Sequence, residues 1–317
     1  MTVLVTGANG FVGAALVQRL LTDDLATEIV AIVRSSVCNF PIGVERIVVG
    51  GIGEANDWHD ALTGCEVVVH LAARVHVMQE AAVDPLDEFR QVNVKGTLNL
   101  AWQAAAAGVQ RFLFVSSIKV NGEATQLGRP FTADDVPTPL DAYAVSKMEA
   151  EQGLREIAQQ TGMDVVIIRP PLVYGPGVKA NFAAMIRWLK FGVPLPLGAI
   201  HNQRSFVGLD NLTDLLMTCI THPGAANQTF LVSDDQDLST TELLCQMGQA
   251  MGYPARLIPV PTSCLKLVAV MVGKSDVYQR LSGSLQVDIE KTHRLLGWSP
   301  PVSVVDGLRQ AVQGLQV

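Results

Sequence analysis

The sequence predicts an α/β protein with a doubly wound parallel sheet and a smaller C-terminal domain. Short β-branched runs alternate with helical stretches at the spacing of βαβ units, which predicts the parallel sheet. The chain opens with an apolar run, a glycine-rich turn and an amphipathic stretch, as the first strand and helix of such a sheet do. A change to a proline-rich texture after Arg169 predicts the second domain.

Residues 1–13, MTVLVTGANGFVG, carry three glycines at spacings of three. The apolar run 3–5 predicts a buried strand, and 11–21 predicts the helix after it. Glycines at this turn let the chain bend sharply and approach a ligand pyrophosphate, to which the helix N-terminus presents unpaired N–H groups. We therefore predict a Rossmann-type dinucleotide site, whose contacting residues here are Gly7, Gly10, Phe11, Val12 and Gly13.

Five further runs predict parallel strands, because they are short, β-branched and uninterrupted, as strands covered on both faces are. These runs span residues 29–33, 46–49, 66–70, 111–115 and 165–168. The most extensive helical stretches between them span 84–107 and 141–160.

After Arg169, prolines at five positions between 170 and 196 break the chain into loops and short helices. We expect an NAD(P)-binding domain over residues 1–170. Residues 171–317 are expected to form mainly a substrate domain, which returns some segments to the first domain and closes over the cofactor.

Composition limits the classes of partner. The chain has 317 residues, of which 49% are hydrophobic, so it can bury a large core in one or two domains. Its net charge of −7, without a Lys/Arg run, argues against nucleic acid or an acidic membrane as partner. The start on a strand leaves no room for a signal peptide, and no apolar run is long enough to span a bilayer. Five scattered cysteines fit reduced thiols in the cytoplasm and no metal site.

The end of the second predicted strand indicates the type of cofactor. An NAD-binding fold usually places an acidic residue about 20 positions after the glycines, where it binds the adenosine ribose. Here the chain reads Val33-Arg34-Ser35-Ser36, without an acid. A guanidinium at this place pairs with a 2′-phosphate, so Arg34 favours NADP(H), and NAD(H) remains the alternative if Arg34 is only a surface residue.

A second constellation is Tyr143-Ala-Val-Ser-Lys147, in the last long helical stretch. Positions i and i+4 share a helix face, so the Lys147 ammonium lies one turn from the Tyr143 phenol. A nearby positive charge lowers a phenol pKa and suits Tyr143 to proton transfer. Ser117, just after the fifth predicted strand, can bond the same substrate oxygen that Tyr143 protonates.

The order and spacing of seven segments resemble those of the extended short-chain dehydrogenase/reductase family, in its branch of nucleotide-sugar epimerases and reductases. The resemblance covers nearly the whole chain. The segments are TGANGFVG (6–13), HLAAR (70–74), NVKGTLNL (93–100), FVSSIKVNGE (114–123), YAVSK (143–147), RPPLVYGPG (169–177) and RSFVGLDNL (204–212).

This resemblance implies a catalytic set of Ser117, Tyr143 and Lys147, in which Lys147 also holds the nicotinamide ribose and Ser117 also touches the substrate. The residues that it implies for the cofactor groove, with Tyr143 and Lys147, are Leu71, Ala72, Ala73, Arg74, Asn93 and Pro170. For the sugar and the nucleotide diphosphate it implies Asn181 and Arg204, with Arg280 as a weaker candidate. It also implies a homodimer formed through the helices at 84–107 and 141–160.

Departures from the family pattern narrow the expected reaction. Nucleotide-sugar 4,6-dehydratases carry an Asp-Glu pair after the active-site Ser/Thr, whereas this chain has Ile118-Lys119. UDP-galactose 4-epimerases usually keep the acid after strand two and a Tyr where this chain has Asn121. Gly51 replaces an Asp that often contacts adenine, so that contact is expected from the backbone near Ile52.

The pattern looks most like the UDP-quinovosamine branch of 4-keto-sugar reductases. We therefore expect an enzyme that reduces C4 of a UDP-4-keto-6-deoxy-hexosamine with NADPH, in the synthesis of surface-polysaccharide (O-antigen) precursors. The first alternative is a UDP-sugar 4-epimerase with bound NAD. The second is a dinucleotide-sensing protein without catalysis, against which the intact Ser117, Tyr143 and Lys147 argue.

Overall fold

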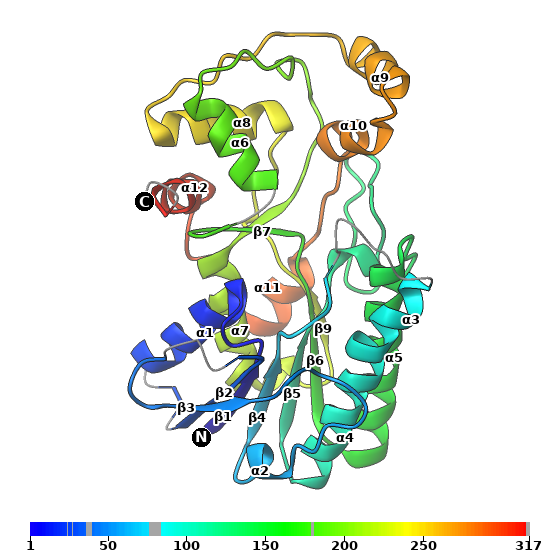
Figure 1. Ribbon diagram of the computed structural model, residues 1–317, viewed down its shortest axis with the longest axis vertical. Coiled ribbons are helices and arrows are strands. Elements are labelled where there is room, and N and C mark those ends of the chain that lie inside the picture. The colour runs from blue at the N-terminus through cyan, green and yellow to red at the C-terminus, as the bar shows by residue number, and fades with distance from the viewer. Residues whose placement is uncertain (24, 27, 36–39, 76–83, 179–180, 315–317) are drawn as a thin grey trace.

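The computed structural model describes residues 1–23, 25–26, 28–35, 40–75, 84–178 and 181–314. A seven-stranded sheet with the order β3-β2-β1-β4-β5-β6-β9 fills its lower half, and all its pairs are parallel (Figure 1). The strands are β1 (Thr2–Thr6), β2 (Glu28–Val33), β3 (Val44–Val48), β4 (Val67–His70), β5 (Arg111–Val115), β6 (Asp164–Arg169) and β9 (Thr229–Leu231). The predicted doubly wound parallel sheet is confirmed.

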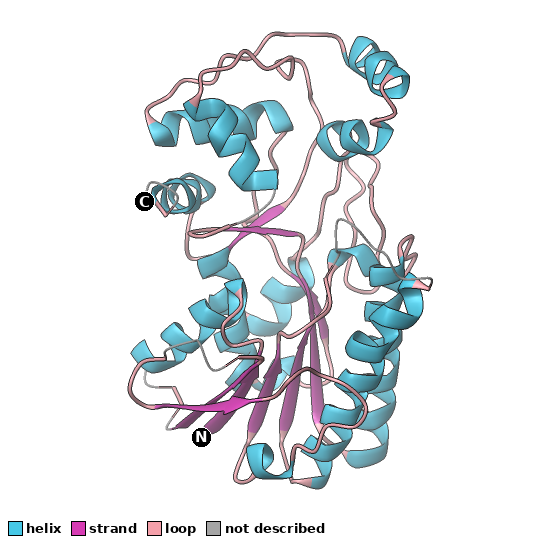
Figure 2. Cartoon of the chain, in the orientation of Figure 1, coloured by secondary structure: helices cyan, strands magenta, loops and turns pink. Residues whose placement is uncertain are grey.

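The two faces of the sheet form two separate cores because side chains alternate along each strand. On β1, Val3 and Val5 enter one core, whereas Leu4 enters the other. The first core is covered by α1 (Phe11–Thr22), α7 (Leu209–Thr221) and α11 (Glu290–Leu296). The second is covered by α2 (His59–Leu62), α4 (Thr97–Ala106) and α5 (Ala142–Thr161), and helices flank both faces in Figure 2.

A second lobe lies above the carboxyl ends of the strands (Figure 1). Its core gathers buried side chains of α6 (Asn181–Lys190), α8 (Thr240–Met251) and α12 (Val304–Gln313). A short parallel pair, β7 (Leu172–Tyr174) with β8 (Phe206–Gly208), joins the two lobes. Phe11, at the start of α1, packs against the core of this lobe, so the glycine turn lies where the two lobes meet.

Several segments after residue 170 return to the sheet. α7 packs against α1, and β9 adds to the edge beside β6. β7, β8 and β9 were absent from the prediction, since strands of three residues are too short to leave a pattern. A division into domains at residue 170 stays a prediction.

One predicted strand needs correction. The run 46–49 was expected to be covered on both faces, but β3 spans Val44–Val48 at the edge of the sheet, and its side chains are exposed or only partly buried.

The predicted helix over 84–107 is confirmed with an interruption. It begins as α3 (Pro85–Arg90), passes through a π-helix over Gln91–Gly96 and continues as α4. Its small residues do not all face outward: Ala101 and Ala104 are fully buried against the chain's own sheet. The homodimer implied by the family resemblance stays a prediction.

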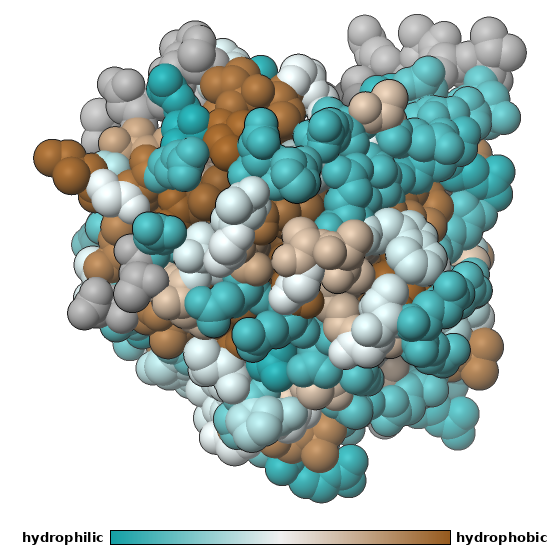
Figure 3. All heavy atoms as spheres, turned by 90° about the horizontal axis from the view of Figure 1, so that it is seen from below, coloured by the Kyte–Doolittle hydropathy of each residue, from teal (hydrophilic) through white to brown (hydrophobic). Residues whose placement is uncertain are grey.

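The described surface mixes polar and apolar side chains. On the face seen from below in Figure 3, hydrophilic residues surround several hydrophobic areas. Among the described residues, no helix combines the length and the apolar character that crossing a bilayer requires.

Candidate active site

The glycine turn between β1 and α1 is tightly enclosed. Gly7 has a φ of +66°, and a Cβ there would lie 2.9 Å from the Ala72 backbone nitrogen. A Cβ at Gly13 would lie 2.1 Å from the Gly7 carbonyl oxygen. Gly10 closes the turn by donating its N–H to that same oxygen at 2.8 Å. Side chains at Gly7 or Gly13 would therefore force the turn open.

The first turn of α1 is built to receive an anion. It contains no acidic residue, and Gly10 at its N-cap supplies no capping side chain. Within the described part of the chain, the N–H groups of Phe11, Val12 and Gly13 have no hydrogen-bond partner. These free donors at the positive end of a helix fit the pyrophosphate of a dinucleotide.

A buried histidine holds β4 beside this turn. Thr6 Oγ1 accepts hydrogen bonds from the backbone N–H groups of Leu71 and Ala72, at 3.1 and 3.2 Å. The hydroxyl proton of Thr6 is therefore directed at Nδ1 of His70, 2.8 Å away. The neutral imidazole then carries its own proton on Nε2, which donates to Thr97 Oγ1 at 3.0 Å. Burial lowers the pKa of His70 to about 3, in agreement with this neutral ring.

The chain Thr6–His70–Thr97 thus fixes the segment Leu71–Ala73 against Gly7. Thr6, His70 and Thr97 belong to segments that carry the family resemblance, but the sequence alone assigned these three residues no role. A histidine that ends a strand of valines is the one signal that could have found the network.

Asn93 lies buried in the π-helix, and its side chain is fully engaged. Its Oδ1 accepts from the backbone N–H of Arg74 at 2.8 Å, and its Nδ2 donates to the Arg74 carbonyl and to Ser146 Oγ, both at 3.0 Å. Ser146 Oγ donates in turn to the Tyr143 carbonyl at 2.7 Å. Asn93 therefore ties the loop after β4 to the helix that carries Tyr143.

Ser117, Tyr143 and Lys147 are brought together at the ends of β5 and α5. Ser117 follows β5, and its side chain is close enough to the Tyr143 phenol to lower the pKa of that phenol. Asp141 begins α5 by accepting the Ala144 N–H at 2.7 Å, which places Tyr143 in the first turn and Lys147 one turn later. Burial first, and the charge of Asp141 second, raise the pKa of Tyr143 to about 12, whereas Ser117 lowers it. The prediction that the Lys147 charge lowers this pKa is therefore wrong, because loss of water around the phenol outweighs any nearby charge.

Lys147 is almost fully buried at the centre of this group. Its Nζ donates to the Val115 carbonyl at 2.9 Å and lies 4.3 Å from the centre of the Phe114 ring. Burial lowers the pKa of Lys147 to about 7, and the carboxylate of Glu151 acts in the opposite direction.

Glu151, which the sequence analysis did not single out, lies one turn beyond Lys147 and is fully buried. Its carboxylate accepts hydrogen bonds from Ser116 Oγ at 2.6 Å and from Arg169 Nε and Nη2 at 2.9 and 2.6 Å. Arg169 also donates to Asn121 Oδ1 at 2.9 Å. One carboxylate thus joins α5 to the ends of β5 and β6.

Pro170 and Lys119 complete this edge. The carbonyl of Pro170, which is buried just after β6, accepts the Ile118 N–H at 3.0 Å. Lys119 Nζ pairs with Asp141 Oδ2 at 2.5 Å and with Glu123 Oε1 at 3.3 Å. Lys119 therefore anchors the start of α5 in the place where dehydratases of the family carry an acid.

The adenosine end of the predicted groove lies at β2 and β3. Arg34 is exposed just after β2, and its guanidinium has no ion-pair partner among the described residues. Ile52 lies close to the π-helix, since a Cβ at Gly96 would meet its Cγ2 at 2.7 Å. This close approach positions the backbone of residues 52–53 beside the first turn of α4.

The other predicted substrate residues, Asn181, Arg204 and Arg280, lie in the second lobe, and Arg204 and Arg280 do not join Tyr143 in any described contact. Arg204 is mostly buried, and its Nη1 donates to the carbonyls of Arg280 and Gly283, at 3.2 and 3.0 Å. The Arg280 side chain is exposed at the end of α10 (Ser275–Ser282). Asn181 begins α6, and its side chain lies outside the described residues.

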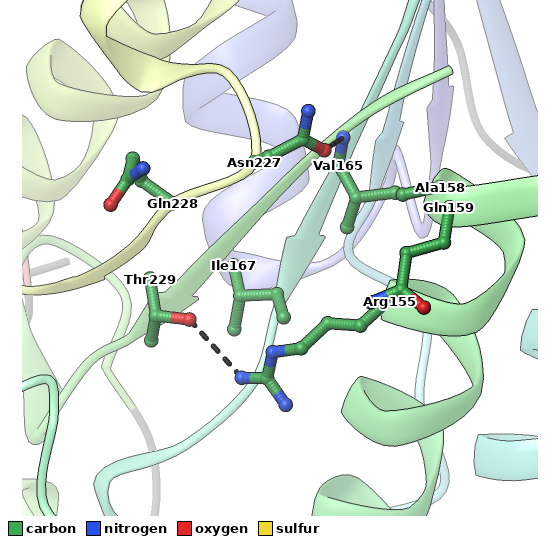
Figure 4. Close-up of a pocket in the computed structure, with 8 residues that line it drawn as sticks. All are labelled: Arg155, Ala158, Gln159, Val165, Ile167, Asn227, Gln228 and Thr229. Atoms are coloured by element: carbon green, nitrogen blue, oxygen red, sulfur yellow. Dashed lines mark hydrogen bonds between the residues drawn. The ribbon is translucent and has the colours of Figure 1, made fainter. Parts of the chain in front are cut away.

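A cavity of about 330 Å³ lies elsewhere, between α5 and the edge formed by β6 and β9 (Figure 4). Arg155 reaches across it to Thr229 Oγ1, at 3.1 Å. Its lining includes none of the predicted site residues: Arg155, Ala158, Gln159, Val165, Ile167, Asn227, Gln228 and Thr229.

Known proteins match this chain over nearly its full length. The model of the NAD dependent epimerase/dehydratase family matches residues 3–233. A UDP-glucose 4-epimerase of Vibrio cholerae is 48% identical over 316 residues, which cover 98% of this chain and 94% of that protein.

Two solved structures share the fold. A Bacillus cereus UDP-glucuronic acid 4-epimerase, in complex with UDP-glucuronic acid and NAD, has a TM-score of 0.79 at 23% identity and covers 99% of this chain and 98% of its own. The RMD protein of Pseudomonas aeruginosa, complexed with NADPH, has a TM-score of 0.74 at 22% identity and covers 100% of both chains.

The glycine turn with free N–H groups and the arrangement of Ser117, Tyr143 and Lys147 agree with these matches. The family predicted from the sequence segments is confirmed: the chain belongs to the NAD dependent epimerase/dehydratase family, the extended short-chain dehydrogenase/reductases.

Proposed function

We propose that this enzyme carries out oxidoreduction at C4 of a UDP-sugar with a nicotinamide dinucleotide. The observation that carries this proposal is the place of Tyr143 on α5, one helical turn from the buried Lys147 and near Ser117 at the end of β5. A bound nicotinamide cofactor supplies the hydride chemistry. The free N–H groups of Phe11, Val12 and Gly13 would hold its pyrophosphate.

The three side chains have distinct tasks in this proposal. The phenol of Tyr143, with its pKa near 12, is protonated at neutral pH and exchanges a proton with the sugar oxygen O4. Ser117 donates a second hydrogen bond to O4 and fixes its position. Lys147, held by the Val115 carbonyl, places positive charge where the phenolate forms and lowers the free energy of that state. Removal of water by burial strengthens each of these interactions.

The first candidate reaction is 4-epimerisation of a UDP-sugar. The Vibrio cholerae relative, identical at nearly half of the aligned positions, is named as a UDP-glucose 4-epimerase. In this reaction Tyr143 accepts the O4 proton as its phenolate and later returns it. Because the hydride taken from C4 is also returned to C4, the sugar undergoes no net oxidation and the enzyme would keep its cofactor from one turnover to the next.

The second candidate is reduction of a UDP-4-keto-6-deoxy-hexosamine with NADPH, as in surface-polysaccharide precursor synthesis. The exposed guanidinium of Arg34 and the lack of an acid after β2 favour the 2′-phosphate of NADPH. Asn121 also supports it, because its side chain is committed to Arg169 and to the Thr132 carbonyl, where UDP-galactose 4-epimerases usually carry a Tyr.

Identification of the cofactor and the product separates the candidates. The purified protein is denatured, and any released dinucleotide is identified by mass. The protein is then incubated with UDP-glucose or UDP-N-acetylglucosamine plus NAD, and with a UDP-4-keto-6-deoxy-hexosamine plus NADPH. Retained NAD and conversion of the first substrates support the epimerase, whereas NADPH consumption with the keto sugar supports the reductase. No C4 change in any mixture would contradict the proposal.

A further inference from the structure

Helix α9 (Thr262–Met271) differs from the other long helices because it is apolar and none of its residues is buried. It lies at the outer end of the second lobe, next to α10 and far from the sheet (Figure 1). Its large apolar side chains are exposed to solvent: Leu267 is 63% exposed and Met271 is 77% exposed. A patch of this kind on a folded protein marks a surface that something covers.

The helix is a well-defined element. It ends in a left-handed Gly273, with a φ of +65°, where the Lys274 N–H donates back to the Ala269 carbonyl at 2.7 Å. Leu265 and Ala269 are partly buried and face the protein, and Leu265 contacts the core of the second lobe. One side of α9 therefore packs against the protein, and the other side is exposed to solvent.

The presented side has a regular pattern. Cys264, Leu267, Val268 and Met271 follow the i, i+3, i+4, i+7 spacing of a single helix face, and all four are exposed. Val272 extends the same apolar surface beyond the helix end and is also exposed. We refer to these five side chains as the α9 face.

The chain segment that contains α9 carries a charge opposite in sign to that of the whole chain. The whole protein has 30 acidic residues and a net charge of −7. Between Glu242 and Asp276, however, there is no Asp or Glu, and the charged residues of this stretch are Arg256, Lys266 and Lys274. All three are exposed. The overall charge argues against an anionic surface as partner, but this region of the molecule would be attracted to one.

We propose that the α9 face binds the surface of an anionic lipid bilayer, with its apolar side chains in the headgroup boundary and Lys266 and Lys274 at the lipid phosphates. Lys274 follows the C-terminal end of the α9 face, and Lys266 lies on the opposite, exposed side of the helix. Apolar residues on one side of a helix with lysines on its polar side are the composition of helices that lie in a membrane interface. A second copy of the chain would bring the same positive charges toward one another, so charge complementarity favours the bilayer. The proposal is independent of the reaction at C4.

Vesicle binding tests the proposal directly. The full-length protein is sedimented with vesicles of phosphatidylcholine alone and with vesicles of three parts phosphatidylcholine to one part phosphatidylglycerol. We expect binding to the anionic vesicles that weakens with added salt, since the lysine contribution is screened. Failure to bind anionic vesicles at low salt would overturn the proposal.

Two double variants separate the contribution of the lysines to vesicle binding from that of the apolar side chains. Lys266→Ala with Lys274→Ala should weaken partitioning by about fivefold for each lysine. Leu267→Gln with Met271→Gln should weaken it by about tenfold or more, because two apolar side chains no longer enter the boundary. The matched control is Val136→Gln with Leu140→Gln, which removes two apolar side chains that are 81% and 73% exposed elsewhere. Equal losses in the control and the α9 variants would overturn the proposal.

A fluorophore on the exposed Cys264 reports the location of the bound helix. Cys65 and Cys219 are buried, and a Cys264→Ser protein measures the background labelling. The emission of an environment-sensitive dye at Cys264 should shift to the blue with anionic vesicles and remain unchanged with phosphatidylcholine. A blue shift that rises with protein concentration in the absence of vesicles would show that a second copy covers the face, and would overturn the proposal.

Discussion

The carboxylate of Glu151 and the guanidinium of Arg169 form a two-point hydrogen bond in the interior, with distances of 2.9 and 2.6 Å. Both side chains are buried, and the same carboxylate also accepts from Ser116 Oγ. Because Ser116 lies between Val115, whose carbonyl accepts from Lys147, and Ser117, which lies near Tyr143, the pair fixes the backbone that carries the proposed proton-transfer group.

Glu151→Gln removes the charge of this pair and keeps its shape. Since it leaves the Arg169 guanidinium buried without its counter-ion, the free energy of unfolding should fall by about 3–5 kcal/mol. Glu149→Gln on the same helix is the control. Glu149 pairs with Arg90 near the surface, at 2.5 Å, and its loss should cost at most about 1 kcal/mol. Denaturant titration measures both, and similar losses would contradict the assignment.

The same variant should also change the pH profile of turnover. The Glu151 carboxylate raises the pKa of Lys147, which burial lowers to about 7. Without that carboxylate the ammonium loses its proton at a lower pH, so the alkaline decline of kcat should move to lower pH. An unchanged alkaline limb would show that Glu151 has a structural role alone.

Arg34→Asp exchanges attraction for repulsion at the end of β2. It should weaken NADPH binding by at least tenfold and leave NADH binding nearly unchanged, because only NADPH carries the 2′-phosphate. Calorimetric titration of both cofactors against both proteins checks this. Equal weakening of the two would show that Arg34 is only a surface residue.

Arg204→Lys tests the proposed contact with the UDP diphosphate. Arg204 Nη1 is committed to two carbonyls, whereas its Nε and Nη2 have no hydrogen-bond partner among the described residues. Burial lowers the pKa of Arg204, and a phosphate would compensate its desolvated charge. A lysine keeps the charge but not the planar fork, so KM should rise by about tenfold while kcat changes less.

Arg280→Lys is the comparison, because that side chain is exposed and should matter less. Inhibition by free UDP is the second measurement. If UDP inhibits the Arg204→Lys protein as strongly as the wild type, Arg204 does not bind the diphosphate.

His70 should make the protein sensitive to acid. Its folded pKa of about 3 lies below the ordinary value of 6.5, so the unfolded chain takes up a proton between these pH values and the folded chain does not. The stability contributed by the neutral ring is present above about pH 6.5 and falls below it, by at most about 1.4 kcal/mol per pH unit. His70→Gln should reduce this slope, and His59→Gln, at an exposed position, should leave it unchanged. Equal slopes in all three proteins would contradict the prediction.

Local patterns predicted the sheet well, because runs such as 29–33 are β-branched, continuous and long enough to be distinctive. The three-residue strands carry too little pattern, and β9 joins the sheet more than 50 residues after β6, at a place that only tertiary packing decides. The π-helix was also missed, since it spans only Gln91–Gly96 and so short a segment carries no residue pattern of its own.

The site was predicted where short segments carry it. The glycine turn and the Tyr143–Lys147 spacing are local, and the structure places both at the carboxyl edge of the sheet. The networks of His70 and Glu151 were not predicted, because their partners come from distant segments: Thr6 is 64 residues from His70, and Arg169 is 18 residues from Glu151. The available signal was the place of Glu151 four residues after Lys147, on the helix face that also carries Leu154.

The central claim is that Tyr143 moves a proton at O4 of a UDP-sugar, and turnover of Tyr143→Phe tests it most directly. The variant keeps the ring that meets Phe89 edge-on, so it should fold and bind the dinucleotide as the wild type does. With a saturating sugar substrate and C4 conversion followed by NMR, kcat should fall by roughly two to four orders of magnitude. Ser117→Ala should cost less, since one bond to O4 remains. A Tyr143→Phe protein that kept more than a tenth of the wild-type kcat would contradict the claim.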